Sequence, residues 1–216
     1  MSKQTGLFRM DGKIGGVSFY RSGGVDLARV ANGPSKEKIA NDPNFRRTRE
    51  NNAEFGGCAS VVKALRLAIG ESKITKSDAQ IVGRLMKIFK EINLAGTGAR
   101  GQRNIDLVDN ATLLQNFEFN SRTSFSSVFT APYSITTTAA RNEATITAAS
   151  FLPASFVNYP DGATHFRVFS VFCTLSNYAY EPDTGKYKAT DPTLDMLNAE
   201  ADSGMIDLSS TTPVTL

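Results

Sequence analysis

Near the start of the chain, two short runs of β-forming residues flank a pair of glycines. The first run ends at Tyr20, the second spans residues 25–30, and Gly23-Gly24 lies between them. Adjacent glycines supply the positive φ angles that a tight hairpin turn needs. The pattern predicts a glycine-rich β-hairpin arm over residues 12–32. Gly15-Gly16 interrupts the first run and indicates a bulge or a close backbone approach.

An isolated hairpin is only marginally stable in water, so this arm must lie on a larger surface. Two surfaces fit: the parent domain of the same chain, or a neighbouring subunit to which the arm adds strands. In the second case the arm makes assembly contacts. The residues that we expect to make them are Lys13, Phe19, Tyr20, Arg21 and Arg29.

A helical period replaces this β pattern beyond a polar connection at residues 35–44. Asp42 as N-cap and Pro43 at the first helical position form a helix-start signal. The apolar positions continue to Ile69, and Gly70 fits the position after the helix end. Gly56-Gly57 predicts a kink or a close approach of another helix.

A second helix is predicted to begin near residues 75–77. The short connection makes the two helices an antiparallel pair. One apolar stripe should face the core, formed by Ile81, Leu85, Ile88, Phe89 and Ile92.

From about residue 110 the hydrophobic period is two, which is typical of strands. The run 166–175 is apolar on both faces and indicates a central, covered strand, whereas the tail 206–216 indicates an edge strand with an unpaired side for docking. Together these strands predict an antiparallel β-sandwich or open barrel. The predicted strands are residues 114–120, 126–129, 134–138, 144–148, 164–175 and 186–189.

The fold class is therefore α+β, with a β-hairpin arm, an antiparallel helix pair and a C-terminal β-domain. The predicted divisions are residues 1–40, 41–104 and 105–216. The net charge of +3 conceals an asymmetry: residues 1–104 contain 19 Lys and Arg against 9 Asp and Glu, and residues 105–216 contain 5 against 12. A basic half can meet a polyanion, or it can meet the acidic half of another copy.

Five arginines are the candidate polyanion contacts. Three crowd the first turns of the first predicted helix, which is the unfavourable end for cations. Two others lie in the glycine-rich loop 94–104. The alternative for the helical arginines is a solvated face paired locally with Glu50 and Glu54. The five are Arg46, Arg47, Arg49, Arg100 and Arg103.

Motifs for catalysis are sparse. The loop 94–104 matches G-x-G-x-x-G, but it follows a helix, whereas a dinucleotide fingerprint follows a strand. His165 is the one histidine, and Cys173 lies eight positions further along the same predicted strand, which places the two about 26 Å apart, too far for a dyad. The spacing of Cys and His residues fits no zinc site. We expect no enzyme, no cofactor, no metal and no small-molecule substrate.

The chain has no apolar run of transmembrane length and no signal-peptide pattern at its start. We therefore expect no membrane insertion and synthesis in the cytoplasm, with later residence in virions or extracellular assemblies. Cys58 and Cys173 are far apart in sequence, which favours reduced, buried thiols over a disulfide.

Several short segments of the sequence resemble those of an uncharacterised family of bacterial proteins, mostly from the Bacteroidota. The resemblance implies the same plan, a glycine-rich basic opening, helices and a β-domain, and it implies no activity and no catalytic residues. In that family the chain runs on into further strands, which implies that a neighbour could supply a missing strand here. The segments are GKIGGVSFY (12–20), LARV (27–30), NDPNFRRTRENNAEFG (41–56), NFEFN (116–120), APY (131–133) and THFRV (164–168).

These patterns favour a non-enzymatic structural protein that assembles with copies of itself. It would be a virion component, as in a bacteriophage, or the subunit of a filament or tube. Strand exchange through the arm and charge-complementary contacts would hold the homopolymer together. The alternative is a nucleic-acid-binding protein that uses its basic N-terminal half.

Overall fold

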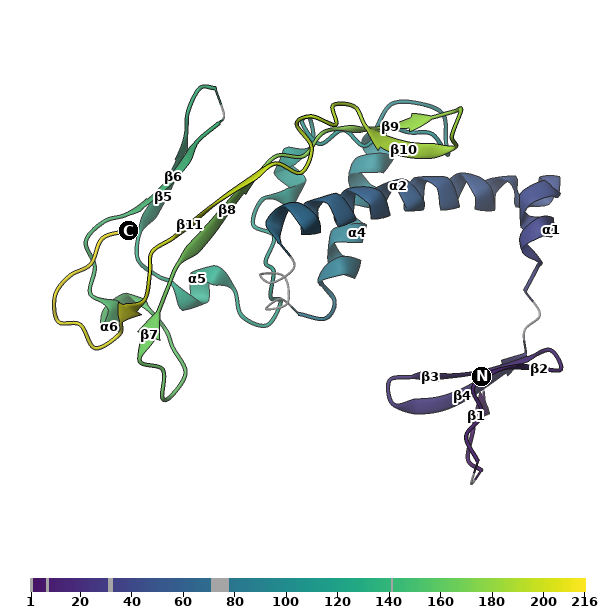
Figure 1. Cartoon of the computed structure of the whole chain (residues 1–216), viewed down its shortest axis with the longest axis horizontal. Helices are drawn as coiled ribbons and strands as arrows, with labels where there is room; N and C mark the ends of the chain where they lie inside the picture. The colour runs from purple at the N-terminus through teal and green to yellow at the C-terminus, as the bar shows by residue number, and fades with distance from the viewer. Residues whose placement is uncertain (1, 7, 31–32, 71–77, 141) are drawn as a thin grey trace. The chain divides into compact units, whose positions relative to one another are not determined.

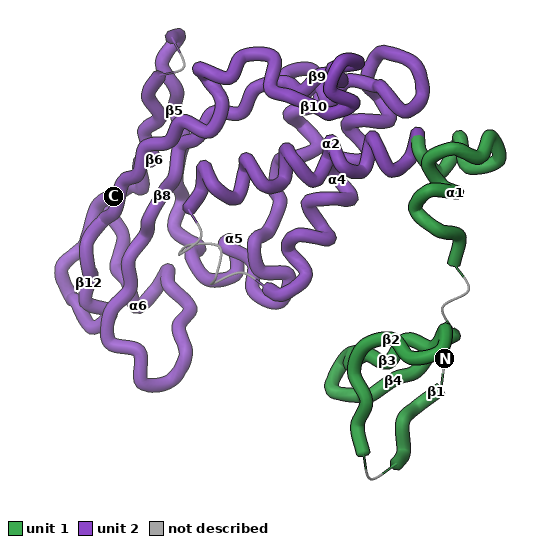
Figure 2. Tube along the Cα trace, turned by 45° about the vertical axis from the view of Figure 1, so that its right-hand side comes forward, with its two compact units in different colours: residues 1–49 green, residues 50–216 purple. Residues whose placement is uncertain are grey.

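The computed structural model describes residues 2–6, 8–30, 33–70, 78–140 and 142–216 (Figure 1). The chain divides into two compact units, an N-terminal unit of residues 1–49 and a C-terminal unit of residues 50–216 (Figure 2). Helices and antiparallel strand pairs together confirm the α+β class. The boundaries predicted at residues 40 and 104 stay predictions.

The N-terminal unit begins with a four-stranded antiparallel sheet. Gly15 and Gly16 have φ angles of 54° and 80°, and Gly23 and Gly24 have 57° and 80°. Positive φ at both central residues makes each glycine pair a two-residue hairpin turn. The bulge predicted at Gly15-Gly16 is therefore wrong, and the arm has more than two strands. The sheet order is β1 (Ser2–Lys3), β4 (Val25–Val30), β3 (Val17–Ser22) and β2 (Gly12–Ile14).

The connection predicted at residues 35–44 contains a short helix, α1 (Lys36–Asn41). Ser35 caps it, because its side chain accepts a hydrogen bond from the Lys38 amide. The predicted capping by Asp42 is confirmed, but for the short 3-10 helix η1 (Pro43–Phe45) that precedes α2.

The long helix α2 (Arg46–Ile69) and helix α4 (Ile81–Ala95) build the first core of the C-terminal unit. Gly70, with φ at 92°, donates its amide to the Arg66 carbonyl and ends α2 as predicted. The start predicted for the second helix lies outside the described residues. Its apolar stripe is confirmed, since Ile88 packs against the core and four residues are buried in it: Ile81, Leu85, Phe89 and Ile92.

Strands β9 (Tyr178–Glu181) and β10 (Lys186–Ala189) close this core from the other side. Tyr187 on β10 is buried against α2, and a Cβ added at Gly57 would lie 2.5 Å from its ring. The glycine pair of α2 therefore permits a close approach, as predicted, but of a tyrosine on a strand. The helices and this part of the β region share one interior.

The remaining strands of the C-terminal unit also pair two by two. Each described pair is antiparallel, so the sandwich or open barrel itself stays a prediction. Short helices interrupt these ribbons. The pairs are β5 (Tyr133–Thr137) with β6 (Ala144–Ala148), β7 (His165–Phe166) with β12 (Ile206–Asp207), and β8 (Phe169–Cys173) with β11 (Asn198–Asp202); the short helices are η2 (Ala111–Leu114), α5 (Phe125–Val128) and α6 (Pro153–Phe156).

Three strand predictions are confirmed to within a residue, at β5, β6 and β10. Two are wrong: residues 114–120 form no strand, and residues 126–129 lie mostly in α5, where the Ser124 side chain caps the helix. The central strand predicted for 164–175 is wrong as well. It breaks after Phe166, and β8 pairs on one side only, with β11.

A second core lies beneath these ribbons and holds the tail. Phe129, Phe151 and Leu208 are buried in it. Val214 bridges Phe151, and Leu216 exchanges two backbone hydrogen bonds with Ala148. The tail thus pairs on one side with its own unit, and the docking role predicted for the unpaired side of residues 206–216 stays a prediction.

Candidate assembly surface

One face of the N-terminal sheet is apolar. Strand alternation places every second side chain on the same face, and the register aligns Val17 with Ile14 on one side and Val30 on the other. Phe19 lies beside them, opposite Ala28. Ile14 is 60% exposed and Val30 64% exposed. These five residues, Ile14, Val17, Phe19, Ala28 and Val30, form what we call the apolar face.

The opposite face of the sheet is basic and aromatic. Lys13 lies opposite Ser18, which lies opposite Arg29 on the next strand. The Arg29 guanidinium lies 5.5 Å from the centre of the Tyr20 ring, a cation–π distance. This face meets an anionic partner better than an apolar one.

The five predicted assembly residues thus share one sheet but divide between its faces. Phe19 and Arg21 lie on the apolar face, and Lys13, Tyr20 and Arg29 lie on the basic face. Arg21 is held locally, because it donates to the Gly24 carbonyl at 3.4 Å and lies 3.8 Å from Asp26.

The N-terminal unit has no interior of its own in the residues that the structure describes. Its one buried side chain there is Ser18, which is 8% exposed. The Ser18 hydroxyl has no hydrogen-bond partner among the described atoms. An unsatisfied buried hydroxyl costs about 1–3 kcal/mol. Neither face of the sheet buries an apolar side chain in the described residues, so hydrophobic burial contributes little to its stability.

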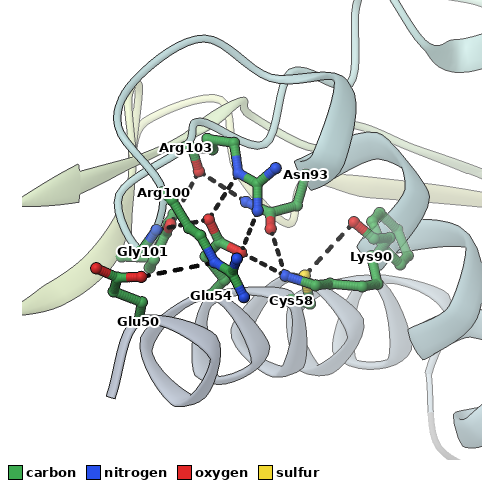
Figure 3. A network of polar contacts seen from close by, with 10 residues as sticks. Glu50, Glu54, Cys58, Lys90, Asn93, Arg100, Gly101 and Arg103 are labelled. Carbon is green, nitrogen blue, oxygen red and sulfur yellow. Dashed lines mark hydrogen bonds and ion pairs between the residues drawn. The ribbon is translucent and has the colours of Figure 1, made fainter. Parts of the chain in front are cut away.

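Arg103, one of the predicted polyanion contacts, belongs to a buried polar network in the C-terminal unit (Figure 3). Glu54 on α2 is 1% exposed. It accepts hydrogen bonds from Arg103 at 2.7 and 2.8 Å, from Lys90 on α4, and from the Gly101 amide at 2.8 Å. Burial raises the pKa of Glu54, but the bonds from Arg103, Lys90 and Gly101 outweigh it and lower the pKa to about 2.

The glycines of the loop 94–104 allow its backbone to pack closely. A Cβ at Gly96 would lie 1.9 Å from the Asn104 carbonyl oxygen, and one at Gly101 would lie 2.9 Å from the Glu50 side chain. Gly101 also has a φ of 93°, which favours glycine. The G-x-G-x-x-G match therefore reflects close packing within the loop at Gly96 and against α2 at Gly101.

The other predicted polyanion contacts also have partners within the chain. Arg100 pairs with Glu50 at 3.5 Å. Arg49 donates to the carbonyls of Ile39 and Asp42 at 2.7 and 2.9 Å, and so holds the end of α1. The two remaining arginines, Arg46 and Arg47, interact within the chain too. Glu50 pairs with Arg100, and Glu54 pairs with Arg103, both in the distant loop.

The residues considered for catalysis do not form a relay. His165 is exposed and lies opposite Asp207, with its Nδ1 3.0 Å from the Thr164 hydroxyl. Ser209 donates its hydroxyl to Asp207 at 2.7 Å. A nucleophilic triad needs the imidazole between the hydroxyl and the carboxylate. Here the Asp207 carboxylate accepts a hydrogen bond directly from the Ser209 hydroxyl, so no imidazole lies between them.

The thiols and potential metal ligands show no site. Burial raises the pKa of Cys58 to about 11 and also raises the pKa of Cys173. The Cys58 thiol lies 3.4 Å from the Phe89 carbonyl and acts as a core residue. Within the described ranges, His, Cys, Asp and Glu side chains form no group of three that could hold a metal. In the same part of the chain, no helix has the length and apolarity to cross a membrane.

Comparison of the chain with protein-family models, with curated proteins and with solved structures found no match.

Proposed function

We propose that this protein is a non-enzymatic structural protein whose copies assemble into a larger particle, such as a virion, a filament or a tube. The observation that carries the proposal is the sheet of the N-terminal unit. It has regular hydrogen bonding and two well-formed glycine turns, but no buried hydrophobic side chain in its described residues. A sheet of this kind becomes stable when another surface covers it.

A second copy suits that role by charge. Residues 1–49 contain 10 Lys and Arg against 4 Asp and Glu, whereas residues 50–216 contain 14 against 17. The acidic excess is concentrated at the end of the chain, where residues 189–216 hold five carboxylates and no Lys or Arg. Opposite charges on the two units favour a head-to-tail contact between copies.

The alternative of nucleic-acid binding has weaker support. Phosphate contacts need cations that are available to the solvent. Arg103 is 20% exposed and is held by Glu54, and Arg49 is held by two carbonyls. Using either cation on a phosphate would break a contact that organises the fold.

The first test replaces one residue of the apolar face. Phe19→Asp places a charge on that face, and we expect it to abolish assembly, since a covered carboxylate without a partner is strongly unfavourable. Phe55→Asp is the matched control, because Phe55 is 54% exposed on α2 of the other unit. The measurement is light scattering and electron microscopy of both variants and the parent protein over a concentration series.

The expected result is ordered assemblies for the parent and for Phe55→Asp, and monomers for Phe19→Asp. A parent protein that stays monomeric at millimolar concentration would contradict the proposal. Equal assembly of Phe19→Asp and Phe55→Asp would show that the apolar face is not the contact.

A further inference from the structure

An open groove runs along one face of the β8–β11 ribbon, next to strand β6. The register places Ser170 opposite Ala201 and Phe172 opposite Ala199, so these four side chains share the face. Two hollows lie along it. One has a volume of about 300 Å³ and is lined by Ser170, Ala201 and residues 144–146 of β6, and the other has a volume of about 630 Å³ and is lined by Phe172 and Ala199.

Strand β6 presents unpaired backbone groups to this groove. Thr138 donates its amide to Glu143, so hydrogen-bonded pairs with β5 recur at every second residue from Glu143. The backbone groups of Ala144, Ile146 and Ala148 therefore point away from β5. Leu216 already bonds both groups of Ala148, at 3.1 and 3.4 Å. Beside this pair, no described residue bonds the outward backbone groups of Ile146 and Ala144.

The groove favours a cation. Among the described residues that line its two hollows, the charged ones are Asp202 and Asp191. Arg167 reaches Asp202 at 3.2 Å, but both side chains are largely exposed, so this pair is weak. An extended segment that carries a positive charge would complement these carboxylates.

Strand β2 of the N-terminal unit is such a segment. It is an edge strand of its sheet. The two-residue turn at Gly15-Gly16 makes Ile14 and Val17 a hydrogen-bonded pair, so the backbone groups of Lys13 point away from β3. The exposed edge of β2 therefore offers one amide and one carbonyl beside a lysine side chain.

We propose that the β2 edge of one copy enters the groove of a second copy and adds a strand beside β6, at Ile146 and Ala144. The inference rests on the proposed function and names the surface that receives the arm. The outward amide and carbonyl of Lys13 bond the edge of β6, and the Lys13 side chain lies near the carboxylates of the groove.

The backbone part of the contact is tested by Lys13→Pro, with Lys13→Ala as the control. Both variants remove the charge, but only proline removes the amide, and that amide makes no bond to β3. We expect Lys13→Pro to associate up to about tenfold more weakly than Lys13→Ala, as the loss of one backbone hydrogen bond implies. Equal association of the two variants would overturn the inference while leaving the proposed function intact.

The partner is tested by cross-linking between chains. In a Cys173→Ser background, a Lys13→Cys variant is mixed with an Ala144→Cys variant and treated with a short bismaleimide. The expected product is a covalent dimer, and mixing Lys13→Cys with Ser60→Cys on α2 should give none. Assemblies without the first dimer would overturn the strand pairing alone. A protein that is monomeric by light scattering would overturn the proposed function together with it.

A chain that carries both Lys13→Cys and Ala144→Cys separates a second copy from the same chain. Treated at a dilution where the parent is monomeric, it should yield no internally linked monomer, which migrates faster in denaturing gels. An internally linked monomer would show that β2 enters the groove of its own chain, and would overturn the choice of a second copy.

Discussion

The two units of this protein differ in how much they bury. In the C-terminal unit, Glu54 is buried with bonds from two cations and a backbone amide. In the N-terminal unit, the buried hydroxyl of Ser18 has no described partner. The C-terminal unit also has two apolar cores, while the described residues of the N-terminal unit contribute to neither. The C-terminal unit thus has an interior of its own, whereas the described N-terminal sheet buries no apolar side chain. Both units hold buried polar atoms without a described partner, Ser18 Oγ in the first unit and Arg66 Nε and Arg84 Nε in the second.

This difference indicates where each unit obtains its stability. Hairpin turns at Gly15-Gly16 and Gly23-Gly24 let the N-terminal sheet form from local signals. Local pairing fixes the register but buries little apolar surface, and burial is the main source of stability. Changes to the interior of the C-terminal unit should therefore affect that unit alone.

The largest effect on the C-terminal unit should come from Arg103→Ala. Removing this cation leaves Glu54 buried with Lys90 as its one charged partner. Breaking a buried ion pair typically costs about 3–5 kcal/mol. We expect the free energy of unfolding, measured by urea denaturation, to fall by that amount.

Arg100→Ala is the matched control in the same loop. Arg100 is 55% exposed and pairs with Glu50 at 3.5 Å, so its loss should cost less than about 1 kcal/mol. Equal losses for Arg103→Ala and Arg100→Ala would contradict the claim that the Glu54 network anchors the loop.

Acid should weaken the C-terminal unit through the same carboxylate. The pKa of Glu54 is lowered from 4.5 to about 2, so the unfolded chain binds its proton more readily than the folded one. The stability from Glu54 is present above about pH 4.5 and is lost as the pH falls toward about 2. It amounts to about 3 kcal/mol.

Unfolding of the parent and of Glu54→Gln should be compared between pH 7 and pH 2. The parent should lose more stability than the variant over the window from 4.5 to 2. Asp78, whose pKa is lowered to about 2 by bonds from Ser121, titrates in the same window in both proteins and cancels. Parallel curves for the two proteins would show that Glu54 does not titrate as described.

The smallest effects should come from the adjacent glycines of α2. A Cβ at Gly57 would lie 2.5 Å from the Tyr187 ring, so Gly57→Ala should destabilise by about 1–3 kcal/mol. At Gly56 a Cβ would meet nothing within 4 Å, so Gly56→Ala should stabilise by up to about 1 kcal/mol. Thermal unfolding should shift in opposite directions for the two variants. A shift in the same direction would contradict the packing of β10 on α2.

Local signals in the sequence predicted much of the fold. The turn at Gly23-Gly24, the helix end at Gly70 and the strand β6 depend on neighbouring residues, and all three are as predicted. The strand 126–129 was wrong because the Ser124 cap favours a helical turn. Strand β11, with the sequence NAEAD, has little β propensity and forms because β8 pairs with it.

The polar sites were harder to predict, because their partners are distant in sequence. Glu54 and Arg103 are 49 residues apart, and the sequence showed each as one charge among many. The arginines of the loop were therefore assigned to an external polyanion. The glycines beside them were the available signal, since a loop with close-packed glycines must lie against another element. The strand positions of Lys13 and Phe19 were predicted correctly, because the strand pattern around them is local.

Hydrogen exchange of the full-length protein at several concentrations tests the central claim most directly. If the N-terminal sheet needs a second copy, the amides of β3 and β4 should exchange rapidly at the lowest concentration and become protected as copies assemble. The amides of α2 and α4 should be protected equally at every concentration. Full protection of β3 and β4 in a sample that light scattering shows to be monomeric would contradict the account.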